Sequence, residues 1–558
     1  MKNNTFFKLF IIFLIAILFR MCFLDKPEGL WNDEYVSWYI ASIKDWHLFV
    51  AKMMQNCHTP FYYLYLKFWM FCFPDTDYSL RISSVIPSLI SVVVMFLTGK
   101  ALKNSKLGLL CAFFTAISSF CIYFAQEVRL YSLLFLFSAL SIFYFIKAAK
   151  SPTKLNLFLF MLFQSLIIFT HTLGIIYSLP AIAALYLYLK NNSDVTFFKK
   201  NFVSFSVVFC LTFLLLLPIL YKIAASDSIS QFWSGFSLSK ILFVFVDYFS
   251  PVQTNIVNSP NSFLSYVYKA NSVRYLFVIF ALIPVAIAFY GLLNSFKSKN
   301  KIYNYLFSAS CVFFFVLVLL AASHKMILIT KYSTEIYPVL LLGIALGFSE
   351  IKNINLRNIL VSVFVFIQLF YLCNASDAVY KRNRTEGNKI VAELIKNSRL
   401  QTGDIVLLTY YDVDKFERYL PDINQFRFLS VNKYNFNYFM FNGENYKQLQ
   451  KNGKFEKKDY FAEFPNKQIL SYSKDYIIYK TQIGDRVGVV FLNTVSFLSN
   501  DMIQQILKDD KKLKYTPFVF LVFSAFKNNI MYSLKDTFKV DSITEYGDWT
   551  LVVFEKVK

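Results

Sequence analysis

Long apolar runs, separated by short stretches that contain lysine, constrain this chain more than any other feature. Of its 558 residues, 56% are hydrophobic and only 16% are charged, whereas about 25% of residues are charged in soluble domains. A helix of about 20 apolar residues crosses the hydrocarbon core of a bilayer. The sequence therefore predicts a polytopic α-helical membrane protein that lies in a lipid bilayer. We expect eleven spans, at residues 6–24, 80–100, 105–124, 128–148, 155–170, 173–190, 202–221, 273–293, 303–322, 334–350 and 356–374.

The basic residues of the short loops follow alternate spans, and this alternation predicts the orientation. By the positive-inside rule, the side that carries them faces the cytoplasm. They are Lys100, Lys103, Lys106, Lys147, Lys150, Lys154, Lys190, Lys199, Lys200, Lys297, Lys299, Lys301, Lys352 and Arg357. The loop at 25–79 is then extracytoplasmic, and the last span exits on the same side. We therefore expect a membrane domain at 1–375 and an extracytoplasmic domain at 376–558.

The formal net charge of +22 does not indicate a nucleic-acid partner. The lysines recur in short clusters between apolar runs, and they form no continuous basic face of the kind that binds nucleic acid. A competing explanation of the charge is codon usage in an AT-rich genome, which favours Lys, Asn, Ile, Phe and Tyr.

The C-terminal region changes character and predicts a small α/β domain. Apolar runs rich in β-formers read IVLLTY, DYIIYK, RVGVVFL, PFVFLVF and WTLVVFEK. A stretch at 500–513 has helical spacing of its apolar residues. The region contains no Gly-rich phosphate loop, no GxSxG motif and no metal-spaced His/Asp cluster, so its sequence indicates no catalytic site of those kinds.

An adjacent acid pair, Asp33 and Glu34, follows the first apolar run within the motif WNDEY. Two interpretations compete. The pair can complement the dipole at the start of a helix, with Asn32 as the N-cap. It can instead supply a general base, which must accept a proton from an acceptor hydroxyl or amine. A second acid would then bind or orient the acceptor.

Other polar residues are expected on the same extracytoplasmic side. His58 lies in the loop 25–79, before Pro60, which suits the first turn of a helix. Around the turn at 126–129, Gln126 and Arg129 are spaced i,i+3, and Glu127 and Tyr131 are spaced i,i+4, so each pair would share a helical face. Charges at the end of a span are costly unless they are paired or line a cavity, although simple snorkelling is the alternative.

Two further positions complete the set of candidate substrate-binding residues. His171 lies between the fifth and sixth spans. Lys331 and Tyr332 precede the tenth span, where an extracytoplasmic lysine departs from the positive-inside pattern and suggests anion binding.

The order of these motifs carries a family resemblance. WNDEYVSWYIA, HTPFYYLYLKFW, DYSLRISSVIPSLISV, FAQEVRLYSL, THTLG and KYSTEIYPVLLLGIAL follow one another. This series resembles the bacterial protein-mannosyltransferase-like family of GT-C glycosyltransferases, in the superfamily that includes lipid A aminoarabinose transferase. The resemblance covers roughly residues 1–375.

The resemblance implies a GT-C fold in a bacterial inner (cytoplasmic) membrane. It also implies an inverting transfer of a sugar from a polyprenyl-phosphate donor to an extracytoplasmic acceptor. By motif position, Asp33 corresponds to the catalytic acid and Glu34 to its partner. His58 and Arg81 match positions in the first outer loop and at the start of the second span.

The resemblance also assigns the phosphate-binding residues. Gln126, Glu127 and Arg129 match a QE-x-R motif, and Lys331 with Tyr332 stands where the family usually has Arg-Tyr. Arg129 and Lys331, together with Arg81, would stabilise the leaving phosphate. No metal ligands are assigned, and dependence on a divalent ion is open, because GT-C enzymes with and without one exist.

Two alternatives of other classes remain. The chain could be a transporter or flippase for a lipid-linked saccharide, or an inactive relative that serves as a scaffold. Transporters usually place ionisable residues near the middle of the membrane. The expected gathering of charges at one outer face favours an enzyme.

Overall fold

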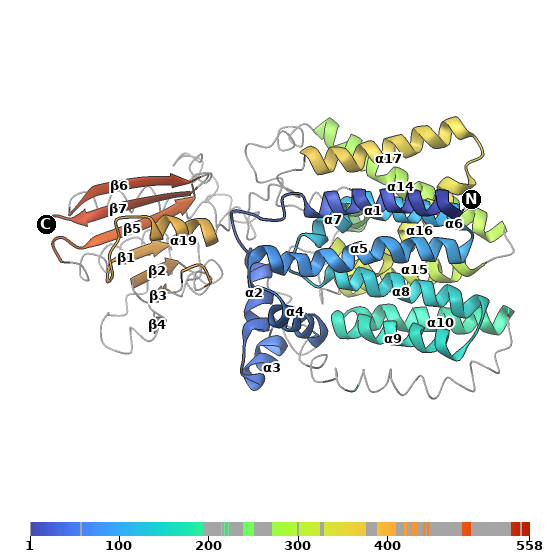
Figure 1. Cartoon of the computed structure of the whole chain (residues 1–558), viewed down its shortest axis with the longest axis horizontal. Coiled ribbons are helices and arrows are strands. Elements are labelled where there is room, and N and C mark those ends of the chain that lie inside the picture. The colour runs from blue at the N-terminus through green and yellow to red at the C-terminus, as the bar shows by residue number, and fades with distance from the viewer. Residues whose placement is uncertain are drawn as a thin grey trace. The chain divides into compact units, whose positions relative to one another are not determined.

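The computed structural model in Figure 1 contains a helical part and a sheet-containing part. The structure describes residues 2–55, 59–192, 214, 217, 221, 238–249, 271–297, 301–323, 328–374, 388–408, 418–420, 427–431, 439–441, 444–445, 482–492, 537–546 and 549–558. Two compact units divide the chain: the first contains Met1–Lys26 and Val36–Asn383, the second Pro27–Tyr35 and Arg384–Lys558. The predicted domain boundary at residue 375 falls outside the described residues and stays a prediction.

The described helices account for most of the first unit. They are α1 (Lys2–Met21), α2 (Asn32–Ser42, which belongs to this unit from Val36 on), α3 (Trp46–Gln55), α4 (Pro60–Cys72), α5 (Asp77–Leu102), α6 (Ser105–Ile117), α7 (Ser119–Ala125), α8 (Tyr131–Lys150), α9 (Lys154–Thr170), α10 (Gly174–Asn192), α12 (Leu238–Phe249), α14 (Asn271–Lys297), α15 (Ile302–Ala322), the 3-10 helix η3 (Thr330–Ile336), α16 (Tyr337–Glu350) and α17 (Ile354–Asn374).

Helices long and apolar enough to cross a membrane confirm the prediction of a multi-pass membrane protein. Within the described residues there are five, at Asn4–Met21, Asp77–Leu102, Tyr131–Lys150, Ile302–Ala322 and Thr330–Glu350. Shorter apolar helices lie at Lys154–Thr170, Ala281–Lys297 and Ile354–Leu369. The predicted total of eleven spans is not established, and the span expected at 202–221 lies outside the described residues except for 214, 217 and 221.

One predicted span differs from the structure. The sequence predicts a single helix over 105–124, whereas α6 and α7 meet at Ser118 with a bend of 57°. The Ser118 hydroxyl accepts a hydrogen bond from the Cys121 backbone N–H at 3.2 Å, and it lies 2.8 Å from the Tyr337 hydroxyl. The Ser118 side chain caps the start of a new helix within the apolar run. It lowers the free-energy cost of the break, because it satisfies a backbone donor that the bend exposes.

A buried arginine anchors α1 against its neighbours. The Arg20 side chain is 0% exposed. Its guanidinium donates to Ser88 Oγ at 2.8 Å and to the carbonyl oxygens of Ala116 and Thr115 at 2.9 and 3.1 Å. A charged group inside a membrane bundle is tolerated when hydrogen bonds of this kind satisfy it. Arg20 therefore ties α1 to α5 and to the end of α6.

Helices also form outside the predicted spans. The loop 25–79 contains α2, α3 and α4, and Pro60 lies in the first turn of α4, as predicted. α12 (Leu238–Phe249) is a further helix outside the predicted spans. α9 ends at Thr170 and α10 begins at Gly174, so His171 lies between two separate helices, as expected.

A mixed sheet forms the centre of the second unit. In the described part of the chain it has seven strands in the order β4-β3-β2-β1-β5-β7-β6. β1 (Ile405–Leu408) pairs parallel with β2 (Arg427–Val431) and with β5 (Arg486–Leu492). β3 (Phe439–Phe441), β4 (Glu444–Asn445), β6 (Phe538–Tyr546) and β7 (Trp549–Lys556) pair antiparallel with their neighbours.

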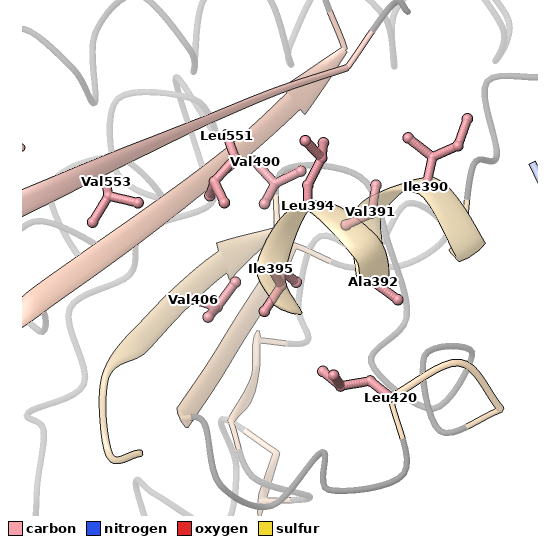
Figure 2. Packing of buried hydrophobic residues seen from close by; sticks show 10 residues of the cluster. All are labelled: Ile390, Val391, Ala392, Leu394, Ile395, Val406, Leu420, Val490, Leu551 and Val553. Carbon is pink, nitrogen blue, oxygen red and sulfur yellow. The ribbon is translucent and has the colours of Figure 1, made fainter. Parts of the chain in front are cut away.

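Helix α19 (Asn388–Lys396) packs its apolar side on this sheet. Figure 2 shows Val391, Leu394 and Ile395 of α19 beside Val406 of β1 and Val490 of β5, within a buried cluster. β1, β5 and β7 coincide with three of the runs that predicted strands. The predicted strands DYIIYK and PFVFLVF and the predicted helix at 500–513 lie outside the described residues.

Candidate active site

Two cationic side chains of the first unit lie beside one buried tyrosine ring. Tyr131 is the first residue of α8, and it is buried. The guanidinium carbon of Arg129 lies 5.9 Å from the centroid of its ring, and Lys331 Nζ lies 6.0 Å from the same centroid. Lys331 Nζ is also 5.8 Å from the ring centroid of Tyr332. At these distances the negative face of an aromatic ring attracts a cation, so the rings help to hold two positive charges near each other.

His171 joins the same group of side chains. Its ring centroid lies 6.5 Å from that of Tyr131 and 6.1 Å from that of Tyr332. We call Arg129, Tyr131, His171, Lys331 and Tyr332 the cation–aromatic cluster. All five are residues that the sequence predicts for substrate binding, and they come from the turn before α8, the start of α8, the end of α9 and η3.

Glu335 is a site residue that the sequence reasoning missed. Its Oε1 lies 2.7 Å from Nδ1 of His171, and both side chains are buried. Its Oε2 is also buried, and within the described part of the chain it has no hydrogen-bond partner. The signal was present in the sequence, because Glu335 is an acid inside the start of the predicted span 334–350, where a charge is costly without a role.

The chain turns between α7 and α8, as the sequence predicts around 126–129. Residues 126–130 are turn and bend, so the predicted i,i+3 helical relation of Gln126 and Arg129 is wrong. The Arg129 backbone N–H donates to the Glu127 carbonyl oxygen at 2.8 Å, a contact that an α-helix does not make. The break frees Arg129 from the helical register, and its Nη1 donates to Ser37 Oγ of α2 at 3.3 Å.

Gln126 fastens this turn to the end of α1. Its Nε2 donates to the carbonyl oxygens of Phe19, Arg20 and Cys22 at 3.3, 3.3 and 2.8 Å. The Oε1 of the same amide is buried and, among the residues described, has no hydrogen-bond partner. Gln126 therefore holds the backbone with its nitrogen. Glu127, which follows it, is buried as well.

Arg81 makes a similar connection near the start of α5. Its side chain is buried, and Nη1 donates to the carbonyl oxygen of Leu24 at 3.2 Å. Arg81 thus links α5 to the segment that follows α1. His58, the remaining candidate of the first outer loop, lies outside the described residues.

The acid pair belongs to the second unit, in the segment Pro27–Tyr35. α2 begins at Asn32, which makes Trp31 the N-cap and Glu34 the third helical residue. Glu34 is buried, and its Oε2 accepts a hydrogen bond from the Trp31 backbone N–H at 3.2 Å. This contact is the glutamate half of a capping box. The capping interpretation therefore applies to Glu34, although with Trp31 at the position expected for Asn32. Asp33 is half-buried.

Helix α12 supports η3, the element that carries Lys331, Tyr332 and Glu335. The Tyr248 hydroxyl lies 2.6 Å from Ser333 Oγ, and its ring stacks on Tyr337 with centroids 4.6 Å apart. Thr330 Oγ1 donates to Asp247 Oδ2 at 3.1 Å. Although part of Asp247 stays accessible, burial of its carboxyl raises the pKa to about 8, and the Thr330 hydrogen bond opposes that rise. The Asp247 carboxyl is thus largely protonated at pH 7.

Among the described residues, no group of three or more His, Cys, Asp or Glu side chains is arranged to hold a metal ion.

No protein-family model matches the chain, and no curated protein matches its sequence. Several solved structures are similar to it. ArnT from Cupriavidus metallidurans in the apo state superposes with a TM-score of 0.52 at 12% identity, over 98% of this chain and 97% of ArnT. The same protein bound to undecaprenyl phosphate gives a TM-score of 0.50 at 11% identity, over 99% and 98%.

A partial similarity extends to the S. cerevisiae protein O-mannosyltransferase Pmt1–Pmt2 complex bound to the sugar donor. It has a TM-score of 0.32 at 17% identity and covers 41% of this chain and 36% of that one. The full-length similarity to ArnT shows that the two chains share a fold, as the resemblance to GT-C glycosyltransferases predicted.

Proposed function

We propose that this chain is a membrane glycosyltransferase that moves a sugar from a polyprenyl-phosphate donor to an extracytoplasmic acceptor, with inversion at the anomeric carbon. Two findings support the donor class. The chain shares its fold with ArnT, which has been solved bound to undecaprenyl phosphate. It also has several helices that can cross a bilayer, so a lipid-linked donor can reach it from the membrane.

The cation–aromatic cluster is the observation that carries the proposal. Arg129 and Lys331 lie near one ring, at the ends of two apolar helices. A departing polyprenyl phosphate carries concentrated negative charge. Arginine binds phosphate oxygens in a fork, and lysine acts as a point charge. Two cations held beside the same aromatic ring suit a phosphate that must be stabilised as its bond to the sugar breaks.

In the proposed reaction, Asp33 accepts the proton of an acceptor hydroxyl or amine. The acceptor atom attacks the anomeric carbon from the face opposite the phosphate, and the carbon–oxygen bond to the phosphate breaks. The electron pair leaves with the polyprenyl phosphate, whose charge Arg129 and Lys331 stabilise. Glu34 caps the helix start that presents Asp33. No nucleotide is required, because the phosphate is already the leaving group.

The test is transfer of a labelled sugar from polyprenyl-phosphate donors in membranes that contain the protein. Asp33→Asn is compared with wild type, and Tyr290→Phe serves as the control because Tyr290 is an exposed residue of α14. We expect wild type and Tyr290→Phe to transfer the sugar equally, and Asp33→Asn to lose at least about a hundredfold in rate. Equal activity of Asp33→Asn would remove Asp33 as the base. No transfer from any lipid donor would instead favour a transporter or a scaffold.

A further inference from the structure

The segment that carries the acid pair is held by residues that follow it by more than 350 positions in the sequence. Residues Pro27–Tyr35 group with Arg384–Lys558 in one compact unit. The backbone N–H of Leu30 donates to the Tyr419 hydroxyl over 2.6 Å, across 389 residues of sequence. The backbone N–H of Lys389, in α19, donates to the carbonyl oxygen of Glu28 over 3.2 Å.

The aromatic ring of Tyr419 is itself held in place by packing. The ring packs against the buried cluster that α19 forms with the sheet, and the guanidinium carbon of Arg418 lies 5.9 Å from its centroid. The hydroxyl is therefore presented from a packed core. A hydrogen bond donated to so constrained an acceptor restricts the Leu30 backbone more than one donated to a mobile surface side chain, because little further entropy is lost in forming it.

The backbone conformation at Gly29 permits this contact, and it leaves no room for a larger residue at this position. Its φ is +78°, in the region that side chains other than glycine rarely adopt. A Cβ at this position would lie 2.5 Å from Tyr419 Oη and 2.9 Å from Lys389 Cβ. The close approach of the segment to Tyr419 therefore depends on the missing side chain of Gly29.

The held backbone groups follow one another up to the acid pair. Glu28 is bound through its carbonyl, Leu30 through its N–H, and the N–H of Trp31 donates to Glu34. Asp33 follows as the second residue of α2. We infer that Tyr419 is a positioning residue, which fixes the entry of α2 through Leu30 and thereby the direction of the Asp33 carboxyl. This inference rests on the proposed function, in which Asp33 is the base.

The experiment uses the full-length protein in lipid nanodiscs, with Tyr419→Phe compared with wild type and with Tyr290→Phe. Phenylalanine keeps the ring in the core and removes only the acceptor of the Leu30 hydrogen bond. Hydrogen–deuterium exchange of the peptide that covers residues 28–35 should accelerate about fivefold in Tyr419→Phe and stay unchanged in Tyr290→Phe. The kcat for transfer should fall about tenfold, while the donor KM stays within about twofold.

A double-mutant cycle with Gly29→Ala separates positioning from general destabilisation. Both substitutions break the same contact, so their effects on kcat should be clearly less than additive. Unchanged exchange, unchanged kcat or additive effects would each overturn the positioning role. If the wild-type protein transfers no sugar, the proposed function is wrong. The hydrogen–deuterium exchange measurement would still report whether Tyr419 holds the segment.

Discussion

His171 Nδ1 lies 2.7 Å from Glu335 Oε1, and both side chains are buried at the edge of the cation–aromatic cluster. Removing one partner of a buried polar pair leaves the other desolvated and unsatisfied. We expect His171→Ala and Glu335→Ala each to destabilise the protein by about 3 kcal/mol. The double variant should cost much less than the sum, because neither side chain then remains buried without its partner.

Thermal unfolding of the purified protein in detergent measures this coupling. Glu335→Gln provides the matched control, because the amide oxygen can still accept a hydrogen bond from His171. It should lose less stability than Glu335→Ala. Additive losses in the double variant would mean that the two side chains do not act as a pair.

Arg129 and Lys331 should differ in which substitutions they tolerate. Arg129→Lys loses the planar fork, and we expect donor KM to rise about tenfold. Lys331→Arg keeps the charge and restores the residue that the family resemblance leads one to expect, so it should retain activity. Lys331→Gln should lose about tenfold or more in kcat/KM. Steady-state kinetics with a polyprenyl-phosphate donor checks all three, and a Lys331→Gln protein as active as wild type would exclude Lys331 from phosphate binding.

The contact between Glu34 and the Trp31 amide predicts unequal roles for the acid pair. Glu34→Gln retains an oxygen that can accept the Trp31 N–H, so kcat should stay within about threefold of wild type. Glu34→Ala loses the cap, which should cost about 1 kcal/mol of stability. Thermal unfolding and transfer rates measured on both variants test this. A Glu34→Gln enzyme as inactive as Asp33→Asn would give Glu34 a role in the chemistry.

The raised pKa of Asp247 predicts a pH-dependent stability. Burial raises the pKa of this carboxyl to about 8 in the folded protein, from an ordinary value of 3.8. The folded state therefore holds this proton more tightly than the unfolded state. Its contribution to stability is complete below about pH 4 and is lost as pH rises towards 8, by an amount of the order of a few kcal/mol.

Asp247→Asn keeps the shape and an acceptor for Thr330 but cannot ionise. Its unfolding temperature should exceed that of wild type at pH 8 and approach it at pH 5. Asp45→Asn is the matched control at an exposed aspartate, and it should leave the difference between the two pH values unchanged. If wild type and Asp247→Asn show the same pH profile, Asp247 is ionised in the folded protein.

Much of the membrane part follows from patterns that depend only on local chemistry. Apolar length and the spacing of basic residues predict where α5, α8 and α15 lie, because a bilayer admits only segments that satisfy their own backbone. Pro60 predicts the start of α4, since proline fits the first helical turn. The sequence also names the five residues of the cation–aromatic cluster as candidates on one membrane face, because polar residues at span ends must pair or line a cavity, but it does not predict that they pack around Tyr131.

The remaining features depend on contacts that no local pattern reveals. The break at Ser118 needs the cap that its hydroxyl supplies and the nearby Tyr337 hydroxyl, from far along the chain. Glu335 is recognised as a site residue only through its contact with His171, which is distant in the sequence. β6 escaped prediction because it is an edge strand with charged residues among its apolar ones, a composition that protects an edge from further pairing. The roles assigned to the acid pair and to the cluster remain predictions.

The hydrogen bond between Leu30 and Tyr419 has a consequence for how the protein is made. The two residues are 389 positions apart, and a ribosome adds about 5–20 residues per second. The segment that bears Asp33 is therefore synthesised tens of seconds before its partner exists. Residues 27–35 cannot reach their final conformation until Tyr419 of the 558-residue chain has been added. A truncated product would retain the apolar helices yet lack the partner that holds the acid, so it would enter the membrane without the assembled base.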